Sequence, residues 1–172
     1  KDAAVFRTLQ EKPLKQARLA AFGMTRRAHS PAREDAGLQA LLASEAPACT
    51  LVGKAWDFHV AQALQVDTEE NLKMIAESVA YLKEHDREVI FDAEHFFDGC
   101  LSNRDYAMRC LRAAADAGAD WLVLCDSNGG ALPADVASAT RAVAEELPGT
   151  PLGIHCHNDS GVAVAASLAA VE

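Results

Sequence analysis

Two histidines separated by one residue stand near the end of the chain, in the segment GIHCHND at residues 153–159. Side chains alternate between the two faces of a β-strand, so His155 and His157 point to the same side. Two imidazoles on one side of a strand end can bind a single metal ion, although an isolated pair at this spacing is slightly more often structural. Because an amide and a carboxylate (Asn158 and Asp159) follow directly, the segment favours a metal site that these two side chains support.

A pair of carboxylates ends another apolar run, in the segment FDAEHFFDG at residues 91–99. Asp92 and Glu94 are two residues apart and therefore share one face of a strand. A carboxylate in a partly apolar pocket has a raised pKa and can act as a general acid or base. From spacing alone, it is equally plausible that the two are solvated or form salt bridges with Lys and Arg side chains.

A third polar strand end is the segment LCDSNGG at residues 124–130. Its glycines let the backbone approach a ligand closely, and the Ser127 hydroxyl can donate a hydrogen bond to a carboxylate or keto oxygen. Asp126 stands beside it as a further candidate for substrate binding. The simpler role of the segment is a tight turn into a helix that begins near Pro133.

The other histidines give weaker signals. His59 follows Trp56 and Asp57 at the end of an apolar run, and a lone histidine is more often structural than a metal ligand. The histidines at positions 29, 85 and 95 carry no pattern that indicates a function.

These polar segments follow short apolar runs that are rich in Val, Ile, Leu or Phe. Nearly continuous hydrophobicity over so few residues is typical of strands that are buried on both faces. The predicted strands cover residues 18–25, 49–56, 88–94, 120–126 and 151–157.

Helical patterns separate the predicted strands. Asp67 and Glu70 form a D-x-x-E capping arrangement before one helix. A second pattern follows Asn103 and ends at Gly118, a residue suited to terminating a helix.

The last two predicted helices lie nearer the end of the chain. One begins at Pro133 and breaks at residues 148–149, where proline and glycine follow each other. The other begins near Gly161, and Asp159 could cap it as well as support the metal site.

Regular alternation of strands and helices predicts an α/β fold with a parallel sheet. A doubly wound nucleotide-binding sheet is disfavoured, because no GxGxxG or P-loop follows any predicted strand. Polar residues gather where several strands end, which is typical of a TIM (β/α)8 barrel with its chemistry at the C-terminal face. A whole barrel needs eight strands and typically ~250 residues, so the chain is predicted to be a large section of one.

Composition narrows the class of protein. The chain has 172 residues, half of them hydrophobic, and a net charge of −9 without basic clusters, which argues against nucleic acid or an anionic membrane as the main partner. Its five cysteines form no CxxC pair, which predicts reduced thiols in a cytoplasmic protein. Neither a membrane span nor a signal peptide is predicted, and a first residue other than Met suggests an excised piece.

Taken together, the three polar segments resemble the isopropylmalate synthase, homocitrate synthase and citramalate synthase family over nearly the whole chain. The segments GKAWDFHV (residues 53–60), FDAEHFFDG and LCDSNGG are most similar to (R)-citramalate synthases. The resemblance implies a metal-dependent barrel that condenses acetyl-CoA with a 2-oxo acid. The acid would be pyruvate or 2-oxoisovalerate, and the enzyme an acyltransferase of isoleucine or leucine biosynthesis.

The resemblance also implies a domain organisation. Residues 1–172 would form one incomplete catalytic barrel domain, about strands three to seven with their helices. The first two strands, the last strand and a C-terminal regulatory region would be absent, and so would an Arg-Asp pair whose Asp binds the metal. The full-length protein would be a homodimer, and the isolated section would be inactive.

Site roles carry over only to matching positions. His155 and His157 would bind a divalent metal ion, Mg²⁺ or Mn²⁺, with Zn²⁺ as an alternative. Glu94 would be a catalytic residue that holds or protonates substrate oxygens, and Ser127 replaces the family's usual threonine. Asp92 and Asp126 are the further candidates for binding the substrate.

Two other readings remain open at the level of sequence. A hydroxymethylglutaryl-CoA-type lyase shares the paired histidines but cleaves its substrate, and it would need a reactive cysteine loop beyond this chain. Alternatively, the chain is an inactive structural fragment that pairs with a second copy through its open sheet edges.

Overall fold

The five predicted strands form one sheet in which each strand lies beside its sequence neighbours and runs parallel to them. A doubly wound sheet reverses its strand order at a switch point, whereas this order, β1-β2-β3-β4-β5, runs without reversal. Sequential parallel strands form the wall of a barrel, so the predicted partial (β/α)8 barrel is confirmed. The strands are β1 (Ala20–Met24), β2 (Ala48–Lys54), β3 (Glu88–Glu94), β4 (Trp121–Asp126) and β5 (Leu152–Cys156).

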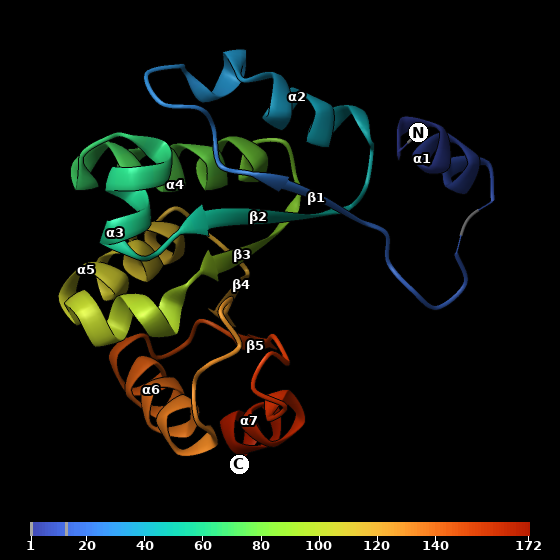
Figure 1. Ribbon diagram of the computed structural model, residues 1–172. Coiled ribbons are helices and arrows are strands. Elements are labelled where there is room, and N and C mark those ends of the chain that lie inside the picture. The colour runs from blue at the N-terminus through green and yellow to red at the C-terminus, as the bar shows by residue number, and fades with distance from the viewer. Residues whose placement is uncertain (1, 13) are drawn as a thin grey trace.

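The computed structural model describes residues 2–12 and 14–172. Figure 1 shows that α2, α4, α5, α6 and α7 form an arc around the strands, while α1 lies outside that arc. None of the helices in these two ranges is long and apolar enough to cross a membrane. The helices are α1 (Asp2–Glu11), α2 (Ala36–Ala43), α3 (Asp57–His59), α4 (Thr68–Lys83), α5 (Phe96–Asp116), α6 (Pro133–Glu146) and α7 (Ala163–Val171), with short turns η1 (Ala32–Glu34) and η2 (Val60–Leu64).

Local signals set the start of α4 and the end of α5. The Asp67 carboxylate accepts a hydrogen bond from the Glu70 N–H at 2.7 Å, which confirms the predicted cap of α4. Gly118 follows the last turn of α5 with a φ of 96°, as expected of a glycine that ends a helix. However, α5 begins well before the predicted position, and Asn103 interrupts it with non-helical angles (φ −151°, ψ 78°).

Alternation along β3 separates the core from the inner face of the barrel wall. Val89, Phe91 and Ala93 are completely buried in the core between sheet and helices. The intervening residues, including Asp92 and Glu94, face the opposite side. The polar side chains of this strand therefore lie on the inner face, where barrel enzymes place their chemistry.

The first turn of α5 packs directly on the chain that follows β2. A Cβ added to Gly99 would lie 2.4 Å from the Ala55 carbonyl oxygen, a distance that real Cβ atoms do not adopt. Only glycine allows this approach, and the approach fixes the start of α5 above the ends of β2 and β3.

We predict that Gly99→Ala lowers the free energy of unfolding by about 1–3 kcal/mol through overpacking. The clash should outweigh the advantage of about 1 kcal/mol that alanine has over glycine inside a helix. Urea denaturation measures the change. Gly130→Ala is the matched control, because nothing lies within 4 Å of a Cβ there. A Gly99→Ala protein as stable as the wild type would contradict the prediction.

Candidate active site

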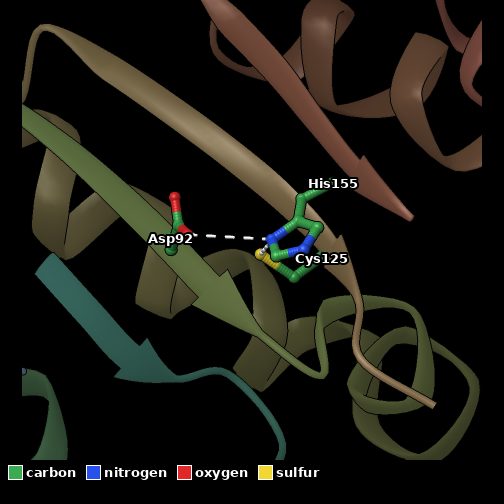
Figure 2. A group of neighbouring side chains, drawn as sticks. All are labelled: Asp92, Cys125 and His155. Atoms are coloured by element: carbon green, nitrogen blue, oxygen red, sulfur yellow. Dashed lines mark hydrogen bonds and ion pairs between the residues drawn. The ribbon is translucent and has the colours of Figure 1, made fainter. Parts of the chain in front are cut away.

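Three inward-facing side chains at the ends of β3, β4 and β5 surround one point. The sheet register pairs Cys125 with His155, and Asp92 reaches the same place from β3. Figure 2 shows the three side chains turned toward one another. The His155 Nδ1 atom lies 3.9 Å from an Asp92 oxygen and 4.0 Å from the Cys125 sulfur, and all three candidate ligand atoms lie within 4.8 Å of one another.

Burial controls the charge of this cluster. It raises the pKa of the Asp92 carboxyl, while the electrostatic interaction with His155 acts in the opposite direction. This agrees with the predicted carboxylate in a partly apolar pocket. Burial also raises the pKa of the Cys125 thiol, and the negative charges of Asp92 and Glu94 raise it further. Cys125 is therefore a neutral thiol at physiological pH, whose sulfur lies 3.7 Å from the Val123 carbonyl oxygen.

The two histidines of the HxH segment lie side by side. Their ring centroids are 5.0 Å apart, with planes inclined at 43°, as expected of residues that share one side of a strand end. The His157 N–H donates to the Asp126 carbonyl oxygen at 3.1 Å, which ties the end of β5 to β4. The His155 side chain is about half exposed, so one edge of its ring is accessible from solvent.

The imidazoles of His155 and His157 and the carboxylate of Asp92 fit a divalent metal ion. Imidazole nitrogens and a carboxylate suit Mn²⁺, Co²⁺ and Zn²⁺, whereas Mg²⁺ prefers oxygen ligands and retains several waters. His155 and His157 would hold such an ion, with an Asp92 carboxylate oxygen 3.9 Å from the His155 Nδ1 atom. Metal binding by these residues stays a prediction.

The segment after β5 differs from expectation at one position. The predicted N-cap role of Asp159 is wrong, because Val162 occupies the N-cap position of α7 and its own side chain makes no capping hydrogen bond. Instead, the Asn158 side-chain oxygen accepts a hydrogen bond from the Ala163 N–H at 3.1 Å. Asp159 packs on Gly129, where an added Cβ would lie 2.6 Å from its carboxylate.

The two predicted polar residues at the end of β4, Asp126 and Ser127, make different contacts. The buried Asp126 carboxylate accepts hydrogen bonds from the Gly130 and Ala131 N–H groups at 3.2 and 3.1 Å, so these contacts favour a structural role. Substrate binding by Asp126 stays a prediction. The Ser127 oxygen accepts from the His95 N–H at 2.9 Å, and its own hydrogen remains a donor for a ligand.

Sequence reasoning missed His95, which forms the turn between β3 and α5. It adopts a left-handed conformation with φ 57° and ψ 35°, and its ring lies 3.1 Å from an Asp98 carboxylate oxygen. The His59 and His95 ring centroids are 4.2 Å apart, with Trp56 beside both. In the sequence, the position of His95 directly after Glu94 was the signal that could have identified it.

Lys54 was also missed. It ends β2 and forms an ion pair with Glu94, so the salt-bridge alternative for Glu94 describes this contact correctly. The apolar run that predicted β2 contains this one lysine, at the position where the strand reaches the polar end of the wall.

Comparison with known proteins gives concordant matches. The HMGL-like family model matches residues 4–172. The (R)-citramalate synthases of Aquifex aeolicus and Geobacter sulfurreducens are each 50% identical over 171 residues, covering 99% of this chain and 32% of each synthase. The chain thus spans about a third of the length of these curated relatives.

A solved structure supports the fold. The HMG-CoA lyase of Bacillus subtilis superimposes with a TM-score of 0.77 at 18% identity, covering 97% of this chain and 54% of the lyase. At this identity the likeness concerns the fold alone.

We predict that the free energy of unfolding of Asp92→Asn, relative to that of the wild type, increases as pH rises. A folded-state pKa above the ordinary value of 3.8 gives the wild type stability at low pH, and this stability is lost as pH rises through the raised pKa. The amide does not titrate, so denaturation curves collected from acid to neutral pH should diverge in favour of Asp92→Asn. Asp105→Asn controls for removing an exposed carboxyl. A difference that stays constant with pH would contradict the prediction.

Metal binding is expected to require both paired histidines. His155→Asn and His157→Asn should each weaken Mn²⁺ or Co²⁺ binding by at least about tenfold, because each removes a nitrogen ligand. Isothermal titration calorimetry on the full-length protein that contains this chain measures the affinities. His85→Asn removes an exposed imidazole outside the cluster and should leave them unchanged. Unaltered binding by both paired variants would place the metal elsewhere.

Proposed function

The chain belongs to the HMGL-like family, and from this premise we propose that it forms the central catalytic wall of a synthase that condenses acetyl-CoA with a 2-oxo acid. Pyruvate is the proposed acceptor, giving citramalate, and 2-oxoisovalerate is the alternative, giving 2-isopropylmalate. The observation that carries the proposal is the 50% identity to (R)-citramalate synthases across 99% of the chain. The product would serve isoleucine or leucine biosynthesis in the cytoplasm.

The reaction forms one carbon–carbon bond and breaks one carbon–sulfur bond. Acetyl-CoA loses a methyl proton, and the resulting carbon nucleophile adds to the keto carbon of the 2-oxo acid. The keto oxygen takes up a proton and becomes a hydroxyl group. Water then cleaves the thioester, which releases CoA and makes the overall conversion irreversible.

The paired histidines supply the electrophilic side of this chemistry. His155 and His157 would hold a divalent cation, which polarises a substrate carbonyl when it is bound. Asp92 lies 3.9 Å from the Nδ1 atom of His155, a position that favours presenting the other ring nitrogen to the metal.

Side chains of the neighbouring strands would bind the substrate oxygens. The Ser127 hydroxyl can donate to a carboxylate or keto oxygen, because its hydrogen bond with the His95 N–H uses only its acceptor side. Glu94 stands on the same inner face as Asp92 and would accept hydrogen bonds from hydroxyl or protonated oxygens of the substrates. We do not assign to it the removal of the acetyl proton.

The proposal concerns a protein longer than this chain. Because the curated synthases are about three times as long, we propose that activity requires segments beyond these residues and that the full-length protein works as a homodimer. The lyase alternative is less well supported, since the match to the B. subtilis lyase is 18% identical and shows only the fold.

A thiol-release assay tests the proposed function. The full-length protein that contains this chain should liberate free CoA from acetyl-CoA when pyruvate and Mn²⁺ or Mg²⁺ are present, and mass spectrometry should detect citramalate. Faster release with 2-oxoisovalerate would identify the alternative acceptor. If no 2-oxo acid stimulates thiol release, the proposal is wrong, and cleavage of hydroxymethylglutaryl-CoA would establish the lyase alternative.

A further inference from the structure

Lys54 is a basic side chain next to a carboxylate of the site. The sheet register places it directly opposite Glu94, and the two side chains form an ion pair. Both lie mostly inside the protein, with 14% of the lysine side chain and 28% of the glutamate side chain exposed. The Ala55 N–H also donates to the Glu94 carbonyl oxygen at 3.0 Å, so backbone and side chains both join these strand ends.

A buried polar network between the sheet and the helices α4 and α5 fixes the backbone of Lys54. The Asn71 side-chain amide donates to the Lys54 carbonyl oxygen at 2.9 Å and lies 2.7 Å from the Tyr106 hydroxyl. The Cys110 sulfur lies 3.6 Å from the same carbonyl oxygen. Asn71, Tyr106 and Cys110 are all buried between α4 and α5. An ordinary surface ion pair has no comparable anchoring, and its two long side chains remain free to separate.

The charges of Lys54 and Glu94 act on neighbouring titratable side chains. The charge of Glu94 contributes to raising the pKa of Cys125, the neighbour of His155. Burial lowers the pKa of His59, His95 and Lys54 lower it further, and Glu94 acts on it in the opposite direction. Glu94 also stands two residues from Asp92 on the same face of β3, and Asp92 belongs to the cluster with Cys125 and His155.

A lysine at this position reduces the electrostatic repulsion between the site and an anionic substrate. Asp92 and Glu94 share the inner face of β3, and two carboxylates so placed would repel an anionic 2-oxo acid. An ammonium group paired with Glu94 removes most of that repulsion and also fixes the direction of the carboxylate.

On these observations, and on the basis of the proposed function, we propose that Lys54 is a positioning residue for the condensation. It holds the Glu94 carboxylate at the edge of the Cys125–His155 cluster and neutralises it, so that an anionic 2-oxo acid can bind beside it. Glu94 contacts the substrates, and Lys54 acts through Glu94.

Exchanging the two charges separates this role from a purely structural one. In the full-length protein, Lys54→Met should lower kcat by about 10²-fold, the scale of loss for a displaced catalytic group, and should raise KM for the 2-oxo acid. Lys54→Arg keeps the charge and should recover part of the activity. The double variant Lys54→Glu/Glu94→Lys should regain thermal stability relative to either single reversal but should remain inactive, because its carboxylate then stands on β2.

Lys83→Met is the matched control. Lys83 pairs with Asp120 at 2.7 Å, at the opposite end of the strands, so its loss should change stability without changing kcat or KM.

Three outcomes would overturn the inference. It is wrong if Lys54→Met behaves kinetically like Lys83→Met, or if the charge exchange restores both stability and activity. If the wild-type protein releases no CoA with any 2-oxo acid, the proposed function fails, and the role of Lys54 in it fails with it.

Discussion

Backbone hydrogen bonds between parallel strands determine which side chains stand at the same level of the barrel wall. That register pairs Lys54 with Glu94 and Cys125 with His155. Because side chains alternate, a slip of one residue in any strand would turn these groups toward the helices. The same slip would expose apolar side chains such as Phe91, which is completely buried. Burial of the outer face therefore holds the polar inner face in place.

The local charge at the C-terminal ends of the strands differs from the charge of the whole chain. The net charge of −9 disfavours anions in general, yet the proposed substrates are anionic. Lys54 neutralises Glu94, and burial favours the protonated form of Asp92. The paired histidines supply ligands for a cation at the same edge. A site can thus accept anions on an acidic protein when its own carboxylates are individually compensated.

Patterns that depend on neighbours in sequence were predictable, and contacts between distant segments were not. Apolar runs predicted all five strands, and alternation predicted that His155 and His157 lie together. The early start of α5 was missed because the docking of Gly99 on the chain after β2 overrides a weak helical pattern. The contact between Lys54 and Glu94 joins residues 40 positions apart, and only the strand register reveals it.

The junction between β3 and α5 consists of His95 alone, since the strand ends at Glu94 and the helix begins at Phe96. A single left-handed residue accomplishes the reversal, at a conformational cost of roughly 1–2 kcal/mol. Adding or removing one amino acid here would rotate the first turn of the helix by about 100°, because each helical residue advances by that angle. An insertion or deletion here would therefore move Gly99 away from the Ala55 carbonyl oxygen and bring a different residue against it.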